Sequence, residues 1–267
     1  TFEDIKMPEQ EIKDDTEIEE TIEEIVPEEK VQQFNEFISI RKTGLPVAYI
    51  TGHKEFFGID FLVTRDVLIP KPDTEILVEE ALNVLWEKSE TGRILTVCDM
   101  CTGSGCVGLS ILNQCKEQNI FADDKMPAFV LADISDKALN VATKNSMRTE
   151  VIPAELENRI KFVRSNLFQM VTGSFDLITA NPPYIPENET IELLQDGRSE
   201  PVLALNGDVN VFTGEPSETK DGLAVIRELV PQAYEHLVPG GTLLVEAGEY
   251  NAEETQIIFS KYGFKKT

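Results

Sequence analysis

The chain has 267 residues, 41% of them hydrophobic, which is enough to build a core in one large domain or two smaller ones. No apolar run approaches the length of a membrane-spanning helix, so no membrane partner is expected. The 24 basic and 48 acidic side chains give a net charge of −24, which disfavours direct, sequence-independent binding to nucleic acid, because such binding needs Lys and Arg to neutralise phosphates. These figures favour a protein or a small molecule as substrate.

The N-terminal part of the chain is strongly acidic, with 13 acidic and 3 basic side chains in residues 1–30. Isoleucines at loose helical spacing leave two interpretations open there, a mobile acidic arm or the end of a helical module. Residues 31–42 carry apolar side chains at helical spacing and predict a short amphipathic helix, which ends before Gly44 and Pro46. Residues 49–70 alternate apolar and polar side chains, which predicts a β-hairpin.

The next predicted element is a helix that Asp73 or Thr74 can cap and that runs through Trp86. Its predicted apolar face holds Ile76, Leu77, Ala81, Leu82 and Leu85. We expect a domain boundary in this region. Residues 1–70 would form an N-terminal segment with a short helix and a hairpin that docks the substrate, and residues 71–267 would form the main domain.

From residue 94 onward, apolar β-rich runs alternate with helical patterns. Strands are predicted at 94–98, 128–131, 160–163, 175–180 and 241–246, and helices at 107–115, 135–146 and 222–237. This alternation indicates an α/β fold, with a mostly parallel sheet and helices on both faces. Residues 185–221 are long and polar, and they are predicted to form a loop that is either functional or disordered.

All four cysteines lie within one short segment, at Cys98, Cys101, Cys106 and Cys115. The first two form a C-x-x-C pair, a spacing found in zinc and redox sites. No second ligand pair or nearby histidine completes such a site, so we expect no metal. Reduced, buried thiols are the favoured interpretation, and they indicate an intracellular protein.

A glycine-rich loop follows the first strand of the α/β region. Gly103, Gly105 and Gly108 have the G-x-G-x-x-G spacing. Glycines at this spacing allow a tight turn and let a ligand approach the backbone at a helix N-terminus. The pattern would serve NAD, FAD or S-adenosylmethionine equally, and tight strand–helix packing is its purely structural alternative.

Polar side chains follow the other strands at the same predicted edge. Asp133 follows the second strand, where a carboxylate can accept both ribose hydroxyls of a nucleoside cofactor, and Ser135 is free to cap the next helix. The third strand ends at residues 165–168, within reach of an adenine ring. The fourth ends at Asn181, where Pro182-Pro183-Tyr184 must leave the sheet because proline lacks the backbone N–H. A bound nucleoside cofactor requires such a convergence of strand ends.

These motifs, in this order, resemble a class I S-adenosylmethionine-dependent methyltransferase that acts on an amide or amino nitrogen. Further motifs narrow the resemblance to the HemK/PrmC family of peptide chain release factor glutamine N5-methyltransferases. They are Gly52-x-x-x-Phe56-Phe57-Gly58, Leu68–Glu75, Arg198-x-Glu200-Pro201-x-x-Ala204-Leu205 and Asp221-Gly222-Leu223. The resemblance covers roughly residues 41–250 and rests on several independent motifs.

The resemblance implies a Rossmann-like, mostly parallel seven-stranded sheet and a cytoplasmic, monomeric enzyme of translation termination. The implied reaction transfers a methyl group from S-adenosyl-L-methionine to the glutamine of the Gly-Gly-Gln loop in a release factor. The implied catalytic residues are Asn181, Pro182, Pro183 and Tyr184. The implied cofactor-binding residues are Cys101, Thr102, Gly103, Ser104, Gly105, Asp133, Asn166, Leu167 and Asn181.

The chain departs from the family pattern in several places. Cys101 stands where glycine is usual, and Asn166 stands where aspartate is common. Residues 206–220 form an insertion before Asp221, and the glutamine that usually follows a few residues after Glu246-Ala247-Gly248 is missing. The region before the hairpin is also shorter and more acidic than the helical N-terminal domain of the family.

Three other functions compete with this interpretation. A nucleic-acid adenine or guanine N-methyltransferase can share the same Asn-Pro-Pro-Tyr tetrapeptide, but the net charge of −24 and the lack of a basic stripe argue against it. An NAD-dependent oxidoreductase would have no role for the tetrapeptide. A non-catalytic binding subunit is disfavoured by the intact glycine loop, Asp133 and Asn181.

Overall fold

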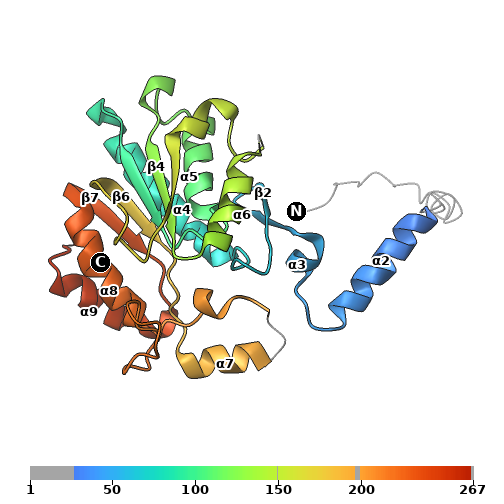
Figure 1. The fold of residues 1–267 in the computed structure, drawn as a ribbon. Helices are drawn as coiled ribbons and strands as arrows, with labels where there is room; N and C mark the ends of the chain where they lie inside the picture. The colour runs from blue at the N-terminus through green and yellow to red at the C-terminus, as the bar shows by residue number, and fades with distance from the viewer. Residues whose placement is uncertain (1–26, 149, 196–198, 266–267) are drawn as a thin grey trace, which may run out of the picture.

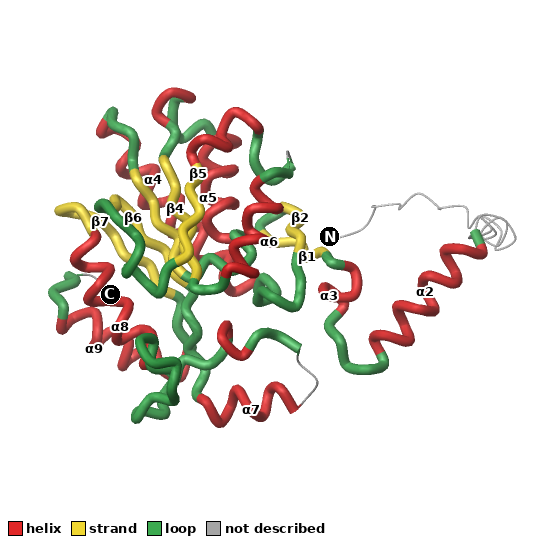
Figure 2. The backbone as a smooth tube through the Cα atoms, in the orientation of Figure 1, coloured by secondary structure: helices red, strands yellow, loops and turns green. Residues whose placement is uncertain are grey.

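A five-stranded parallel sheet forms the centre of the computed structural model, which describes residues 27–148, 150–195 and 199–265. The strand order is β5-β4-β3-β6-β7, and every neighbouring pair is parallel. Figure 2 shows the strands in yellow, with helices around them. The strands are β3 (Thr96–Met100), β4 (Ala128–Asp133), β5 (Ile160–Arg164), β6 (Phe175–Ala180) and β7 (Leu237–Val245). The predicted alternation of strands and helices is therefore confirmed.

The expectation of seven strands is not confirmed, because the sheet holds five across the described ranges. After β7 the chain forms the short 3-10 helix η6 (Glu249–Asn251) and the helix α9 (Ala252–Lys261), whose Phe259 is buried in the core. Pro239 and Gly240 lie inside β7, in the stretch where its pairing register with β6 shifts.

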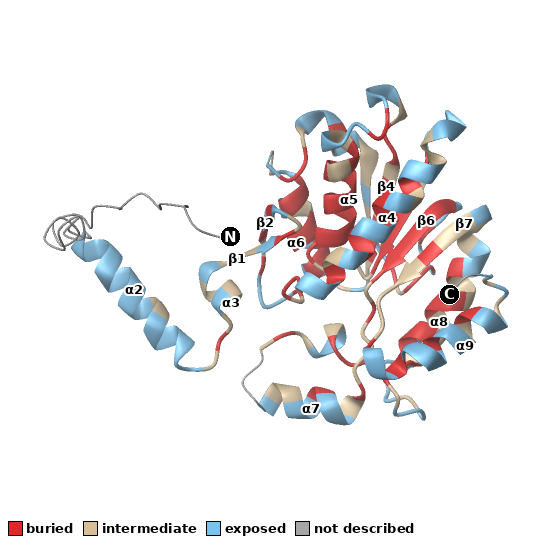
Figure 3. Ribbon diagram, turned by 180° about the vertical axis from the view of Figure 1, so that it is seen from behind, coloured by how far each residue is buried: buried red, intermediate tan, exposed pale blue. Residues whose placement is uncertain are grey.

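Helices cover both faces of the sheet because side chains of each strand alternate between two cores (Figure 3). On β3, Val97 packs into the core that α4 (Glu75–Lys88) and α5 (Cys106–Glu117) cover. Its neighbour Cys98 packs into the opposite core, which α8 (Ala224–His236) covers. The helix α6 (Asp136–Ser146) begins at Ser135, whose Oγ accepts from the Ala138 N–H at 3.2 Å, so the predicted cap is confirmed.

The helix α4 differs from its prediction in two details. Ile76, assigned to the apolar face, is exposed, whereas Val78 is fully buried, so the buried face is rotated from the predicted one. Thr74 precedes the helix but makes no capping bond with its side chain. Its hydroxyl is instead used in a contact with the end of β6, which a capping pattern cannot reveal.

The predicted hairpin is confirmed over a shorter range, as β1 (His53–Phe56) and β2 (Ile59–Leu62). Residues 49–51 belong instead to the short helix α3 (Val47–Thr51). Phe56, Ile59 and Phe61 are buried in the same core as α4 and α5, so the hairpin is anchored on the α/β body. The division at residue 70 stays a prediction.

The helix α2 (Glu28–Arg41) stands apart from the rest of the molecule in Figure 1. It confirms the helix predicted at 31–42, and none of its side chains is buried. Val31, Phe34 and Ile38 are exposed although they are apolar. The acidic residues 1–26 lie outside the described residues.

The segment predicted to be one long loop, residues 185–221, contains the helix α7 (Glu187–Gln195) and the 3-10 helix η5 (Val202–Ala204). The predicted insertion within it is held by Asp208, which is fully buried. The Asp208 carboxylate accepts from the Gly222 N–H at 2.8 Å and from the Glu187 N–H at 3.0 Å. Across the described ranges, no helix has both the length and the apolar character needed to cross a membrane.

Candidate active site

A pocket lies at the carboxyl ends of β3, β4, β5 and β6. The predicted site residues that line it are Cys101, Thr102, Gly103, Ser104, Asp133, Asn166, Leu167, Asn181 and Pro183. Gly105, Pro182 and Tyr184 do not line it in this structure. Four strand ends therefore meet at one edge, as expected for an open parallel sheet.

The glycine loop closes onto Asp133 from the neighbouring strand. The Gly103 N–H donates to Asp133 Oδ2 at 2.9 Å, and the Ser135 N–H donates to Asp133 Oδ1 at 2.9 Å. Burial raises the pKa of the Asp133 carboxyl, while the backbone hydrogen bonds act in the opposite direction. Both oxygens of this carboxyl are therefore held in position by backbone N–H groups at the edge of the pocket.

The three glycines of the motif have different reasons to be glycine. A Cβ on Gly103 would meet nothing within 4 Å, so this glycine leaves open space beside the pocket. A Cβ on Gly105 would lie 3.1 Å from Ala142 Cβ, and one on Gly108 would lie 3.1 Å from Asp99 Cβ. Tight packing therefore explains Gly105 and Gly108, whereas Gly103 has room for a ligand.

The buried carboxyl of Asp99 on β3 holds the glycine loop through hydrogen bonds. It accepts hydrogen bonds from the hydroxyls of Thr102 at 2.5 Å and Thr179 at 2.8 Å, and from the Gly108 N–H at 3.1 Å. Burial raises the pKa of Asp99 to about 6, because desolvation of the charged form outweighs these hydrogen bonds.

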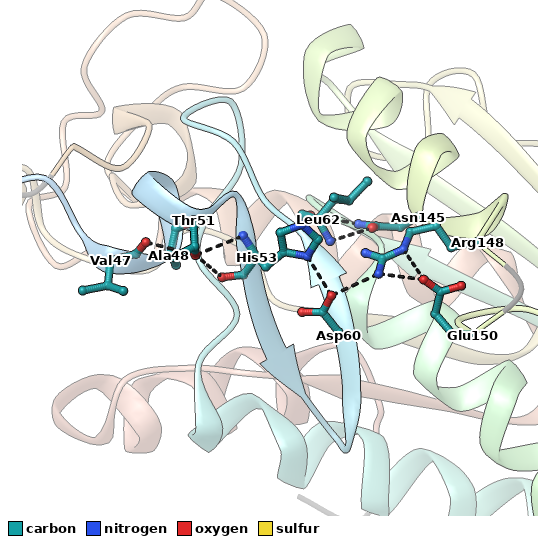
Figure 4. Close-up of polar contacts among 9 residues, drawn as sticks. All are labelled: Val47, Ala48, Thr51, His53, Asp60, Leu62, Asn145, Arg148 and Glu150. Carbon is teal, nitrogen blue, oxygen red and sulfur yellow. Dashed lines mark hydrogen bonds and ion pairs between the residues drawn. The ribbon is translucent and has the colours of Figure 1, made fainter. Parts of the chain in front are cut away.

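The hairpin is connected to the glycine loop through one buried amide, that of Asn145 on α6. Figure 4 shows this amide facing Leu62 of the hairpin. Its Oδ1 accepts from the Leu62 N–H at 2.8 Å, and its Nδ2 donates to the carbonyls of Leu62 at 3.0 Å and Ser104 at 2.9 Å. Beside it, Asp60 accepts from Arg148 at 3.0 Å and lies 2.7 Å from the His53 ring nitrogen.

The side chain of Asn181 is oriented by a partner that the sequence did not reveal. Its Nδ2 donates to Thr74 Oγ1 at 3.1 Å. The other atom of the amide, Oδ1, makes no hydrogen bond to any described residue. Asn181 therefore presents a carbonyl oxygen, an acceptor, at the edge of the pocket.

The turn after Asn181 is enclosed by two glycines and by the segment after β7. The Tyr184 carbonyl accepts from the Tyr250 hydroxyl at 3.1 Å and from Asn251 Nδ2 at 3.2 Å. A Cβ on Gly222 would lie 2.1 Å from that carbonyl oxygen, and one on Gly207 would lie 2.8 Å from Tyr184 Cα. This close approach explains the glycine of the Asp221-Gly222-Leu223 motif.

We expect Gly222→Ala to destabilise the protein and to displace Tyr184. Gly240→Ala is the matched control, because φ is +77° at Gly222 and +78° at Gly240, but only Gly222 has a backbone atom in the way. The control should lose about 1–2 kcal/mol from the positive φ alone, and Gly222→Ala should lose a further ~1–3 kcal/mol from overpacking. Urea unfolding of both variants measures this, and equal losses would contradict the predicted clash.

Two sequence motifs more than a hundred residues apart meet at the pocket. Lys71 Nζ donates to Glu200 Oε1 at 2.7 Å, and the same oxygen accepts from the Ile69 N–H at 3.4 Å. Glu200 is buried, and Lys71 and Pro201 line the pocket. Arg198 lies outside the described residues.

Two non-glycine residues of the pocket have left-handed backbone conformations, Cys101 with φ +59° and Leu167 with φ +47°. Such conformations cost of order 1–3 kcal/mol and are concentrated at functional sites. Across the described ranges all four cysteines are free; Cys98, Cys106 and Cys115 are buried as predicted, whereas Cys101 is half-buried. Phe168 does not reach the pocket but stacks on His236 at 4.7 Å between ring centroids.

The insertion is part of the pocket wall. Val209, Asn210, Val211 and Gly214 line it. Asn166, at the end of β5, donates from Nδ2 to the Val211 carbonyl. A neutral amide can donate here, whereas a carboxylate cannot, so the insertion and the unusual residue at position 166 belong to one arrangement.

Comparison with known proteins identifies relatives that match most of this chain. A protein of Clostridium acetobutylicum named release factor glutamine methyltransferase is 35% identical over 90% of this chain and 75% of its own length. A protein of Leptospira interrogans with the same name is 40% identical over 84% of this chain and 70% of its own length. The chain belongs to the release factor glutamine methyltransferase family.

The fold agrees with this family. The protein-family model described as "Methyltransferase small domain" matches residues 74–197 of this chain. These residues include the glycine loop, Asp133, Asn166 and Asn181. A solved structure described as a SAM-dependent methyltransferase from Agrobacterium tumefaciens aligns with a TM-score of 0.50 at 14% identity, over 79% of this chain and 57% of that one. This likeness concerns the fold alone, which is that of a class I methyltransferase.

Two of the predicted departures from the family pattern have a counterpart in the structure. Cys101 has a φ of +59°, a conformation that glycine adopts freely. Asn166 donates to the Val211 carbonyl, which lies in the predicted insertion.

Proposed function

We propose that this protein transfers a methyl group from S-adenosylmethionine to the side-chain amide nitrogen of the glutamine in the Gly-Gly-Gln loop of a peptide chain release factor. The observation that carries the proposal is the amide of Asn181, whose Nδ2 is held by Thr74 while Oδ1 is left as an acceptor at the pocket. Membership of the release factor glutamine methyltransferase family supports the choice of substrate.

The residues of the pocket fit S-adenosylmethionine. Asp133 offers a carboxylate to the ribose hydroxyls, and the open space beside Gly103 lets a ligand approach the backbone. Ser104, Asn166 and Leu167 complete the wall around it. When bound, S-adenosylmethionine supplies a methyl group on a positively charged sulfur.

The protein's task is to orient a weak nucleophile, because the lone pair of an amide nitrogen is delocalised into its carbonyl. Asn181 Oδ1 and the Pro182 carbonyl each accept a hydrogen bond from the substrate NH₂ group. The fixed φ of proline helps to aim the Pro182 carbonyl. Tyr184 packs against the flat amide. Most of the rate then comes from orientation, helped by acceptors placed where positive charge develops on nitrogen.

Labelled S-adenosylmethionine tests this function directly. The protein is incubated with an intact release factor, and the digest is analysed by mass spectrometry for a methylated glutamine. A release factor with Gln→Ala in the Gly-Gly-Gln loop should take up no label. Equal labelling of naked DNA or RNA would instead favour the nucleic-acid methyltransferase.

We also propose that the helix α2 docks the release factor. A long protein substrate gains from contacts outside the cofactor pocket, since remote binding can position the reacting amide. Val31, Phe34 and Ile38 are spaced three and four residues apart and therefore share one face of the helix. All three are exposed, which suits a surface that a partner covers.

Phe34→Asp should raise the KM for the intact release factor by about 30-fold, because a buried aromatic anchor is typically worth about 2 kcal/mol at an interface. The affinity for S-adenosylmethionine should not change. Ile257→Asp is the matched control, since Ile257 on α9 is as exposed as Phe34, 67% against 61%. If both variants have the KM of the parent protein, α2 has no docking role.

We expect Asn166→Asp to weaken S-adenosylmethionine binding by about tenfold, because two acceptors would then face each other where Asn166 now donates to Val211. Calorimetry with S-adenosylmethionine measures the effect. Asn166→Ala removes the donor without adding a charge and should lose less. A carboxylate variant that binds as tightly as the parent would show that the insertion does not depend on this bond.

A further inference from the structure

Glu246 is a residue beside the proposed site for which neither the sequence motifs nor the proposed mechanism gives a role. It follows β7 directly, and its N–H donates to the Ala180 carbonyl at 3.0 Å. This bond places it next to the end of β6, where Asn181 begins the Asn-Pro-Pro-Tyr turn. Glu246 Oε1 accepts from the Tyr184 hydroxyl at 3.0 Å.

The second carboxyl oxygen of Glu246 is not used by the fold. Among the described residues, Oε2 is buried and has no hydrogen-bond partner. A buried carboxyl oxygen without a partner is unfavourable for stability, so its presence in a native protein calls for an explanation. A carboxylate or an amide oxygen could accept from the Tyr184 hydroxyl at this position, which makes glutamine the conservative replacement for Glu246.

The negative charge of Glu246 acts on the titratable groups of both Tyr184 and Cys106. Burial, followed by the negative charge of Glu246, raises the pKa of the Tyr184 hydroxyl, which therefore keeps its proton and donates. Burial raises the pKa of the Cys106 thiol to about 12, with added contributions from Asp99 and Glu246. Cys106 is one of the residues that line the pocket.

The Tyr184 residue is thus fixed at both ends by the segment after β7. Tyr250 and Asn251 hold its carbonyl, and Glu246 holds its hydroxyl. A ring that packs against a flat amide must keep its orientation to within a few tens of degrees, because methyl transfer depends on alignment. Without the Glu246 contact, the backbone of Tyr184 would stay in place while the ring lost its distal anchor.

We propose that Glu246 is a positioning residue for methyl transfer, which fixes the ring of Tyr184 against the substrate amide. The proposal rests on the proposed function, because it assigns Tyr184 the contact with that amide. It adds a residue from the end of β7 to the site residues that follow β3 to β6.

A double-mutant cycle with Tyr184→Phe and Glu246→Ala tests this role. Each single variant should lower kcat for release factor methylation by about tenfold, the usual effect of losing a hydrogen bond to a charged group. The double variant should lose no more than either single variant, since both remove the same contact. The affinity for S-adenosylmethionine should stay at the parent value, because neither side chain lines the pocket.

Glu246→Gln provides the rescue, because its amide oxygen can still accept from Tyr184, and it should recover most of the lost kcat. Glu249→Ala is the control for the segment, since Glu249 is exposed three residues later. Circular dichroism checks the fold of each variant; if Glu246→Ala does not fold, the cycle is run with Glu246→Leu, which fills the same volume.

Three results would each overturn the proposal. The first is a double variant whose loss in kcat equals the product of the two single losses. The others are a Glu246→Gln variant as slow as Glu246→Ala, and a Glu246→Ala variant with the kcat of the parent. Failure of the proposed function is recognised separately. In that case the parent protein itself transfers no label to the release factor, whereas failure of the positioning role appears only among variants of an active parent.

Discussion

Asn181→Ala should abolish most methyl transfer while leaving the binding of S-adenosylmethionine largely intact. Removing one well-placed polar group from a preorganised site typically costs about 10²–10³-fold in kcat, and here Oδ1 is the acceptor offered to the substrate amide. Steady-state kinetics with the intact release factor measures kcat, and calorimetry measures cofactor affinity. This pattern is that of a group acting on the chemical step.

Thr74→Val separates the acceptor from the residue that orients it. The valine keeps the shape of threonine but removes the hydroxyl that accepts from Asn181 Nδ2 at 3.1 Å. Because Thr74 makes no capping bond with its side chain, the change should not disturb α4. We expect a loss of about tenfold in kcat, smaller than that of Asn181→Ala. Activity near the parent level in Asn181→Ala, with the fold intact by circular dichroism, would contradict the proposed role.

Asp133→Ala should weaken S-adenosylmethionine binding by about 10²-fold, because it removes a carboxylate that can accept from ribose and also frees two backbone donors. Those donors are the N–H groups of Gly103 and Ser135, each 2.9 Å from an Asp133 oxygen. Calorimetry with S-adenosylmethionine and with its demethylated product measures the loss. The loop is affected as well as the contact, so we expect this to be the largest effect on cofactor binding.

Asp136→Ala is the matched control for Asp133. Asp136 lies three residues later, at the start of α6, and its carboxylate forms an exposed ion pair with Arg164 at 3.2 Å. Exposed pairs contribute little, so cofactor affinity should not change. Binding of NADH by the parent protein without binding of S-adenosylmethionine would show that the cofactor has been misidentified.

The features predicted well from the sequence are those that depend on residues close together along the chain. The apolar run 175–180 gives β6 with the same bounds, and Ser135 caps α6 as predicted. The glycine spacing places the loop after β3 because the turn and the helix N-terminus are determined locally. The helix α7 was missed because its segment is polar, and polar segments are equally compatible with loops.

The contacts that could not be predicted join segments far apart in the sequence. Thr74 meets Asn181 across 107 positions, Lys71 meets Glu200 across 129, and Tyr184 meets Glu246 across 62. Helical or strand periodicity contains no information on such pairs, because they depend on how the sheet brings strand ends together. The seven-strand expectation came from the family resemblance, and the apolar runs of this chain had predicted only five strands in the α/β region.

The amide of Asn145 links the hairpin to the glycine loop, so the two segments should open together when the fold opens locally. The Leu62 N–H is held by Asn145 Oδ1, and the same side chain holds the Ser104 carbonyl, so exchange of the Leu62 hydrogen with solvent requires that shared bridge to break. A ligand that binds only the ordered loop suppresses this opening by mass action. The Leu62 amide, which does not line the pocket, therefore provides a hydrogen-exchange reporter of whether the pocket is filled.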